Sequence, residues 1–367
     1  MRKTLLKGIF LAALAVLALF GLLEKGGFGA ETQPSAAPAA APRQSAPPER
    51  VLVALERPAP APQAGLEESA PPQAEARAPE PILHIFDTAL GKSVEMGLED
   101  YVLHTLAGEM PAGYEPEALK AQAVAIRSYA LWKSRAYGGG GCAMAKDADL
   151  CTSSSHCAAF ASDEKMRKNF GTQYEEKLAK LRLAVEETQG LCCAYEGEAI
   201  QALFHSSSGG QTEDSAAVFA QALPYLSSVK SPGEEQERDF RSSLTLKNEE
   251  LAQKLNAAFP GAKLEAAKLQ GQIEILGRSA SGRVLTLRLG EKQASGKALR
   301  GALGLKSTNF TLKFGSGELR FEVLGFGHGV GLSQTGAEAM AKSGAGFREI
   351  LSHYYQGVEI LPLSKLE

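Results

Sequence analysis

Neither sign of charge predominates in this sequence of 367 residues, which carries 39 lysines and arginines against 42 aspartates and glutamates, a net charge of −3. A chain so close to neutral gives no electrostatic basis for binding nucleic acid. The sequence also lacks a G-x-S-x-G motif, which disfavours a serine hydrolase even though serines and histidines, His104 among them, are present. Its glycine-rich segment 325–334 has no Walker lysine, so it is not a nucleotide-binding P-loop.

The first 25 residues have the pattern of an export signal or a membrane anchor. Residues 1–7 are basic, and residues 8–23 follow without a charge. We predict a retained anchor with its basic end inside, although the length of the apolar run does not decide between retention and cleavage. Residues 26–81 are rich in Ala, Pro, Gln, Glu and Ser, so we predict a disordered tether. The remainder, 82–363, is then a folded head outside the cytoplasm.

The head mixes predicted helices and strands without regular alternation, which indicates the α+β class. We expect two lobes with a central groove, and residues 235–315 as a smaller lobe that contains a β-hairpin. A helix is predicted to begin at Pro116, since Leu119, Ala123, Ile126 and Ala130 form one apolar stripe. Further helices are predicted over 174–188, 249–258, 337–342 and 347–355, and strands over 83–86, 191–194, 200–204, 272–276, 284–289 and 319–323.

Glu109 is the candidate catalytic residue. Its spacing from Val102 and Leu106 places it on the inward side of a short helix, at the C-terminal end, before Pro111 stops the helix. The negative end of the helix dipole and partial burial both disfavour ionisation, so both raise the pKa of this carboxyl. The alternative is a surface carboxylate, which is the commoner situation at helix ends. The inward position predicts a general acid.

Four potential metal ligands lie within sixteen residues: Cys142, Cys151, His156 and Cys157. Three thiolates and one imidazole are the ligand set of a tetrahedral Zn²⁺ site. Four protein ligands would make the zinc structural, whereas a site without Cys142 would keep an open position for water. The alternative is a disulfide such as Cys142 to Cys151, because the head is expected outside the cytoplasm.

Two segments are rich in glycine and small polar residues. The first, 204–213, suits a polyhydroxylated ligand such as a sugar chain, and the alternative is an ordinary polar turn. In the second, 325–334, alternate glycines let the backbone approach a bulky ligand, and the alternative is tight strand-to-helix packing. The candidate substrate-binding residues of the two segments are His205, Ser206, Ser207, Ser208, Gly209, Thr212, His328, Ser333 and Gln334.

Five blocks in the head, taken in order, resemble the stage II sporulation protein D family, also called SpoIID/LytB. These blocks are 106–111, 117–129, 204–213, 303–310 and 327–334. The resemblance implies a membrane-anchored lytic transglycosylase that cuts peptidoglycan between mother cell and forespore during engulfment. It also implies a sporulation amidase as partner, which removes stem peptides and leaves denuded glycan strands as substrate.

The resemblance further implies roles for individual residues. The family's catalytic glutamate falls on Glu109 and its helical arginine on Arg127, which could hold a substrate carbonyl or steady the carboxylate after proton transfer. Relatives with a Cys-x4-His-Cys segment bind zinc, which matches Cys151, His156 and Cys157. Some relatives supply the fourth ligand from a histidine, where this sequence offers Cys142.

Two rival functions stay open at this stage. The first is a hydrolase in which Glu213 or Asp214 acts as a second carboxylate beside Glu109, since glycoside hydrolysis normally needs two. The second is a non-catalytic module that binds the wall and recruits or activates an amidase.

Overall fold

The computed structural model describes residues 80–219 and 222–366, which fall within one compact unit, Gln73–Glu367. The predicted anchor at 1–25 and nearly all of the predicted tether at 26–81 lie outside the described residues. Among the described helices, none is both long and apolar enough to cross a bilayer.

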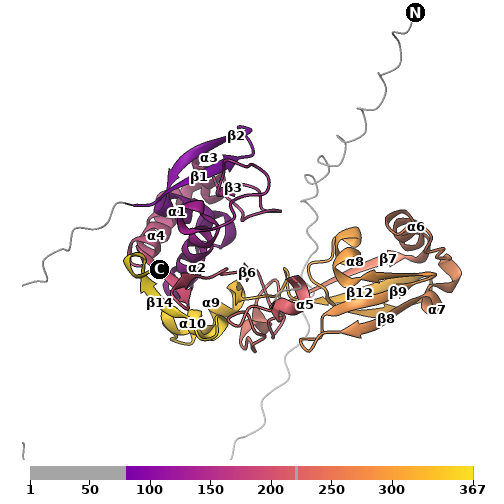
Figure 1. Ribbon diagram of the computed structural model, residues 1–367. Helices are drawn as coiled ribbons and strands as arrows, with labels where there is room; N and C mark the ends of the chain where they lie inside the picture. Colours follow the sequence, from indigo (N-terminus) through magenta and orange to yellow (C-terminus); the bar gives the residue numbers. More distant parts are fainter. Residues whose placement is uncertain (1–79, 220–221, 367) are drawn as a thin grey trace, which may run out of the picture. The chain divides into compact units, whose positions relative to one another are not determined.

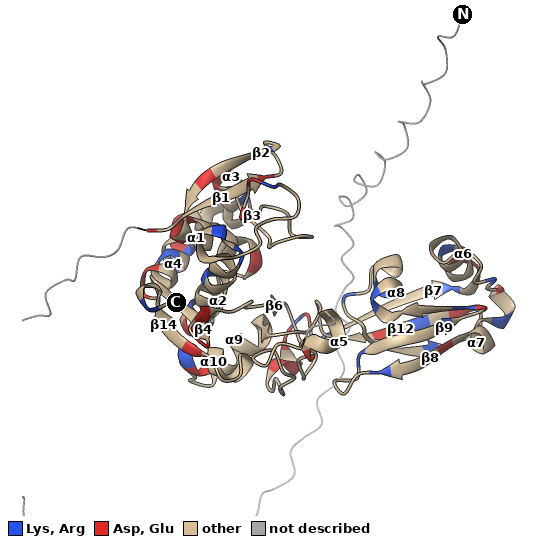
Figure 2. Ribbon diagram, viewed as in Figure 1, with Lys and Arg blue, Asp and Glu red and all other residues tan. Residues whose placement is uncertain are grey.

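Helices and short strands alternate irregularly, so the described part of the chain is a mixed α+β fold (Figure 1). The helices are α1 (Leu98–Glu109), α2 (Pro116–Lys133), α3 (Asp163–Phe170), α4 (Tyr174–Glu186), α5 (Ser215–Phe219), α6 (Asn248–Ala258), α7 (Leu269–Gln272), α8 (Gly296–Leu303), α9 (Gln334–Lys342) and α10 (Phe347–Tyr354). The strands are β1 (Ile82–Asp87), β2 (Lys92–Gly97), β3 (Leu150–Cys151), β4 (Leu191–Tyr195), β5 (Glu198–Ala199), β6 (Phe204–His205), β7 (Arg241–Lys247), β8 (Ile273–Arg278), β9 (Val284–Leu289), β10 (Lys292–Ser295), β11 (Asn309–Phe314), β12 (Glu318–Leu324), β13 (Leu332–Ser333) and β14 (Glu359–Pro362). Figure 2 shows basic and acidic residues interspersed along these elements.

The strands form small sheets instead of one large sheet. Their orders are β2-β1-β3, β14-β4-β5, β13-β6, β10-β9-β8 and β11-β12-β7. Two of these pairings are parallel: β1 with β3, and β6 with β13. The second parallel pair sets Ser333 beside His205, so it joins the two polar segments that the sequence singled out.

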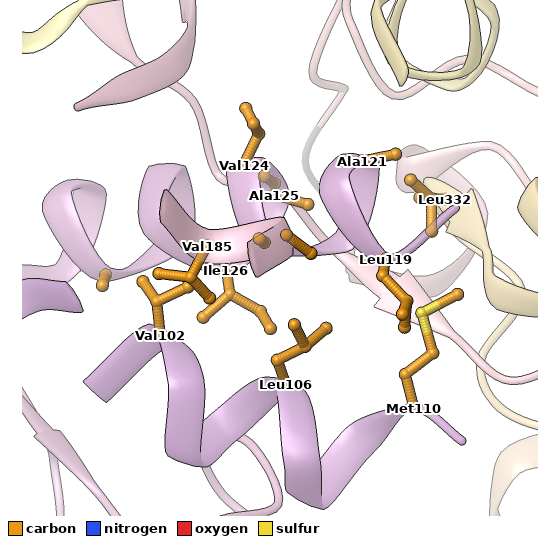
Figure 3. Close-up of a cluster of buried hydrophobic side chains, with 14 of the residues drawn as sticks. Val102, Leu106, Met110, Leu119, Ala121, Val124, Ala125, Ile126, Val185 and Leu332 are labelled. Carbon is orange, nitrogen blue, oxygen red and sulfur yellow. The ribbon is translucent and has the colours of Figure 1, made fainter. Parts of the chain in front are cut away.

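Helices α1 and α2 pack face to face around the first buried cluster. The predicted stripe of α2 is confirmed, because Leu119, Ala123, Ile126 and Ala130 are all buried. The inward side chains are Val102 and Leu106 on α1 and Met110 at its C-cap, and they point toward α2 in Figure 3. Glu109 therefore lies one position off the centre of this apolar stripe.

A second buried cluster draws its side chains from Leu246 to Val323. It includes Phe310 and Phe321, whose ring centroids are 5.8 Å apart in an edge-on arrangement. The predicted hairpin is confirmed as β8 and β9, which pair antiparallel. The two lobes and the central groove stay predictions.

The remaining predicted elements agree with the structure, with one exception. The strand expected over 200–204 is wrong, because only Phe204–His205 at its end is a strand. The backbone before it makes close turns instead, since Ala202 N donates to Ile200 O and Leu203 N to Gln201 O, each at 2.8 Å.

Arg127, in the middle of α2, is fully buried and pairs with Glu99 in the first turn of α1. Its Nε and Nη2 donate to the two carboxylate oxygens of Glu99 at 2.9 and 2.5 Å, and Nη1 donates to Leu191 O at 3.0 Å. This two-pronged geometry locks α1, α2 and β4 together. The substrate contact expected for Arg127 is not what the structure shows, because its side chain has no exposed surface.

Replacing this arginine should therefore destabilise the protein. Arg127→Ala leaves Glu99 without its counter-charge and opens a void, so we expect a loss of about 3 kcal/mol in the free energy of unfolding, measured by urea denaturation. Lys254→Ala, which removes a cation from an exposed pair with Glu250, is the control and should change stability by less than about 1 kcal/mol. Equal effects of the two substitutions would contradict the structural role.

Candidate active site

Glu109 is the last residue of α1, and its side chain is half-buried. Burial raises its pKa above the usual range, as the sequence predicted. Three neighbours oppose this effect: the backbone N–H of Ala159, which donates to Oε1, the side chain of Gln334 and the positive charge of Lys165. The effect of burial is larger than that of the three neighbours, so the pKa stays raised and the protonated form of the carboxyl is favoured. The neighbouring donors can stabilise the carboxylate once it has lost its proton.

The segment that carries Ala159 is fixed tightly against α1. Ala161 N donates to His104 O at 3.0 Å, and His104 Nδ1 donates to Ala161 O at 2.6 Å. Phe160 stacks on the His104 ring at 4.9 Å. Any side chain at Gly108 would overlap the Ala159 carbonyl, so only glycine permits this approach beside Glu109.

Gln334, the first residue of α9, reaches the same carboxyl. Its side chain is buried, and Nε2 makes no hydrogen bond of normal geometry within the described residues. A buried amide with an unused donor costs free energy unless a ligand pairs with it. Gln334 is therefore the predicted binding residue that the structure brings closest to Glu109.

Most of the predicted sugar-binding hydroxyls instead surround a buried carboxylate, Glu234. Its oxygens accept hydrogen bonds from Ser207 Oγ at 2.8 Å, Ser333 Oγ at 3.0 Å, Thr335 Oγ1 at 2.6 Å and Ser208 Oγ. Backbone N–H groups of residues 208 and 210 complete the shell. The structure thus gives these hydroxyls an internal partner in place of the polyhydroxylated ligand that the sequence predicted.

Two further predicted residues also have internal roles. Thr212 is fully buried and exchanges hydrogen bonds with the backbone of Val229. Gly209 has a positive φ of 75°, and a Cβ there would lie 3.0 Å from Gly325 N, so the glycine allows two loops to meet. Ser206, by contrast, is half-buried, and its carbonyl accepts from Thr335 N at 3.0 Å.

His205 and His328 lie together, with ring centroids 5.6 Å apart. Burial lowers the pKa of His205 well below the usual range, and burial with nearby Arg300 and Arg283 lowers that of His328 to about 4, so both rings are neutral. His205 Nδ1 donates to Val330 O at 3.1 Å, which leaves Nε2 as a buried acceptor without a partner among the described residues. This nitrogen is available to a ligand hydroxyl.

The four predicted metal ligands converge. Their ligand atoms all lie within 4.8 Å of one another, so this cluster of Cys142, Cys151, His156 and Cys157 could hold a metal ion. Strand β3 fixes Cys151 beside Phe86 of β1, and a turn at Ser153, whose carbonyl accepts from residues 156 and 157, brings the adjacent His and Cys to one side. None of the five cysteines forms a disulfide.

The two carboxylates proposed for a hydrolase are engaged elsewhere. Glu213 is buried, and its oxygens accept from Ser281 Oγ and from Asp214 N, each at 2.9 Å. The Asp214 carboxylate accepts from Ala216 N at 2.9 Å. Neither carboxylate is among the groups that shift the pKa of Glu109.

The chain matches known proteins over most of the head. A family model described as stage II sporulation protein matches residues 87–195, which include Glu109, Arg127 and the four clustered ligands, and a domain of unknown function matches 211–331. Stage II sporulation protein D of Bacillus subtilis is 36% identical over 288 residues, 78% of this chain and 81% of the relative. The chain belongs to the stage II sporulation protein D family.

Two other relatives are also similar to this chain. Stage II sporulation protein D of Bacillus amyloliquefaciens is 34% identical over 293 residues, covering 78% of this chain and 82% of the relative. A protein of Bacillus subtilis named amidase enhancer is 27% identical over 305 residues, covering 70% of this chain but only 39% of that protein.

Glu234 supplies a prediction with a defined pH dependence. Burial raises its pKa, but hydrogen bonds from Ser208, Thr335 and Ser207 outweigh burial and hold the pKa below the usual range. Glu234→Gln places an NH₂ group against hydroxyl and N–H donors, so we expect a loss of about 3 kcal/mol in unfolding free energy at pH 7.

Because the folded pKa lies below the unfolded value of about 4.3, the stabilising effect is complete above that value and is lost as the pH falls through the folded pKa. The difference between wild type and Glu234→Gln, measured by urea denaturation, should therefore shrink below about pH 4. Exposed Glu235→Gln is the matched control. A difference that does not vary with pH would mean that the Glu234 charge is not what stabilises the fold.

Proposed function

We propose that this protein is a lytic transglycosylase that cleaves the bond between MurNAc and GlcNAc in denuded peptidoglycan strands. The observation that carries the proposal is Glu109, a half-buried carboxyl with a raised pKa and no second carboxylate among the groups that act on it. Hydrolysis by a pair of carboxylates needs a partner, and neither Glu213 nor Asp214 is among the groups that shift the pKa of Glu109. One carboxyl used twice, first as acid and then as base, fits this arrangement.

In the proposed reaction, protonated Glu109 donates its proton to the bridging oxygen as the glycosidic bond breaks. The carboxylate then takes the proton of the muramyl 6-hydroxyl, whose oxygen closes onto C1 and gives a 1,6-anhydro end. Ala159 N–H and Lys165 stabilise the carboxylate between the two steps. Atoms and charge balance without water entering the product.

Two buried nitrogens that make no hydrogen bond of normal geometry within the described residues support substrate contacts. The Gln334 Nε2 donor lies beside Glu109, where it can bind a sugar hydroxyl or acetamido oxygen. His205 Nε2, on the strand that pairs with β13, is a neutral acceptor suited to a hydroxyl. Ser206 and His328 complete the proposed binding residues.

The metal cluster fits zinc. A tetrahedral Zn²⁺ with bonds of about 2.3 Å to sulfur and about 2.0 Å to nitrogen separates its ligands by roughly 3.5 to 3.8 Å. His156 Nδ1 lies 3.5, 3.4 and 3.3 Å from the sulfurs of Cys142, Cys151 and Cys157. The sulfurs of Cys142 and Cys157 are 3.9 Å apart. Held by these four residues, a zinc ion would crosslink the loop and would take no part in the proton transfers.

The proposed setting is the cell envelope during sporulation. The similarity to proteins named for stage II of sporulation supports this setting. The N-terminal anchor predicted at 1–25 would hold the head outside the cytoplasm, in the space between mother cell and forespore. A sporulation amidase would supply the strands by removing their stem peptides.

A second candidate function rests on the relative named amidase enhancer. In that case the head would bind the wall and activate an amidase without cutting glycan. The presence of 1,6-anhydro ends after digestion of peptide-free strands distinguishes the two functions.

Substitution of the proposed acid tests the first function. Glu109→Gln should lower the rate of 1,6-anhydro-muramyl formation by roughly 10² to 10⁴, measured by mass spectrometry of digested strands. In the wild type, activity should fall as the pH rises through the raised pKa of Glu109, because the acid loses its proton. Exposed Glu164→Gln should leave the rate unchanged.

Undiminished cleavage by Glu109→Gln would show that another group is the acid. A wild type that never cleaves, yet stimulates an amidase, would establish the second function instead.

The zinc site has its own test. Elemental analysis of the purified head should give one zinc per chain, and Cys151→Ser should remove the metal and lower the melting temperature. Cys192→Ala, at a buried thiol outside the cluster, is the control and should retain zinc. A metal-free protein whose thiols react only after reduction would point to the disulfide.

A further inference from the structure

One face of the β11-β12-β7 sheet is exposed and polar. The antiparallel register places directly paired residues on the same face, so Thr311, Glu322 and Ser243 form one row and Lys313, Arg320 and Thr245 form the next. Arg241, opposite Leu324, extends this face by one more row. Glu318 and Lys247, which pair directly, form the last row of this face. We call it the outer face, and its exposed members are Arg241, Ser243, Thr245, Lys247, Thr311, Lys313, Glu318, Arg320 and Glu322.

The opposite face of the same sheet packs into the hydrophobic core. Phe310, Leu319, Phe321 and Val323 are buried in the second hydrophobic cluster. The outer face is therefore not needed for the core, and its composition can serve another purpose. Strict alternation along β12 separates the two faces.

Positive charge on the outer face is only partly balanced. Arg320 has its nearest carboxylate in Glu322, at 3.9 Å, the outer limit of an ion pair. Arg241 stacks on the ring of Phe240 at 5.1 Å. Within the described residues, neither Arg241 nor Lys313 forms an ion pair. The outer face thus carries four cations, Arg241, Lys247, Lys313 and Arg320, and two carboxylates, Glu318 and Glu322, in a chain whose net charge is −3.

The outer face is also hollowed. A shallow cavity of about 540 Å³ is lined by Arg241, Ser243, Asn309, Thr311 and Arg320, among others. Guanidinium groups match carboxylates in pairs of hydrogen bonds, and the hydroxyl and amide groups between them match sugar hydroxyls.

The charges are spread along the strands. Arg241 lies four residues from Thr245, the partner of Arg320, so the two positive positions are separated by roughly 13 Å along the sheet. A small anion would occupy one position only. An extended ligand with repeated negative charges would occupy both.

We propose that the outer face binds a second stretch of denuded glycan, through the lactyl carboxylates that each muramic acid exposes once its peptide is removed. This inference rests on the proposed function for the identity of the ligand. The outer face would hold the strand while Glu109 acts elsewhere on the same polymer. It would also distinguish strands that have lost their peptides from neutral N-acetylglucosamine polymers.

The test uses the full chain with Glu109→Gln, so that binding is measured without cleavage. Arg241→Gln, Lys313→Gln and Arg320→Gln together should weaken binding to denuded strands by roughly tenfold, since each exposed charge pair contributes modestly. Binding is measured by cosedimentation or by fluorescence anisotropy of labelled strands. The same three changes in the active enzyme should raise KM more than they lower kcat.

A matched variant controls for net charge. Lys254→Gln, Lys263→Gln and Lys268→Gln remove three exposed cations that already pair with Glu250, Glu291 and Glu265. This variant should bind like the parent. Chitooligosaccharides, and strands whose carboxylates have been converted to amides, should show no difference between the two triple variants. The tenfold difference should also diminish as salt rises.

Three outcomes would overturn the inference. The two triple variants could bind denuded strands equally, or the parent could bind amidated strands as tightly as unmodified ones. The third is binding of the outer face to anionic lipid vesicles but not to glycan. Failure of the proposed cleavage is recognised separately, because it appears as missing 1,6-anhydro ends in the wild type whether or not strands bind.

Discussion

A single buried carboxylate organises the part of the molecule on which the site depends. Glu234 accepts hydrogen bonds from residues 207–210 on one side and from Ser333 and Thr335 on the other. Ser333 is also the N-cap of α9, whose first residue is Gln334. The negative charge of Glu234 therefore determines where α9 begins, and α9 brings Gln334 to Glu109. A buried charge is tolerated here because nearly every lone pair has a donor.

Glu234 and Glu109 show how the surroundings of a carboxyl group determine its pKa. Both are removed from water, which by itself raises the pKa of each. Glu234 has enough hydroxyl donors to reverse the shift, whereas Glu109 has only one backbone N–H, a nearby amide and a more distant lysine. One carboxyl is consequently a permanent anion that supports the fold, and the other is suited to exchange a proton.

The sequence predicted those features that local patterns encode. The α2 stripe and the β8–β9 hairpin are confirmed because local spacing determines them. The four potential metal ligands lie close together in the sequence, and the pairing of β1 with β3 helps to bring them together in the fold. The raised pKa of Glu109 was predicted from the helix dipole and partial burial together, and burial is its cause in the structure. The burial of Glu234 was not predicted, because it lies beside Glu235 in a charged stretch, and such stretches are typical of solvent-exposed segments. Its donors lie up to 101 residues away in the chain, and no local pattern reveals them. Arg127 was misjudged for the same reason, since its partner Glu99 belongs to another helix.

The distances along the chain at Glu234 also bear on the order of folding. Helices α1 and α2 follow each other directly, and they can pack as soon as both exist. The bonds from Glu234 to Ser333 and Thr335 close loops of 99 and 101 residues, so they form only after a larger entropic cost has been met. We expect an early folding state in which Glu109 already lies at the end of α1 while Gln334 has not yet reached its position beside it. Completion of the proposed site around Glu109 is then a late event in folding.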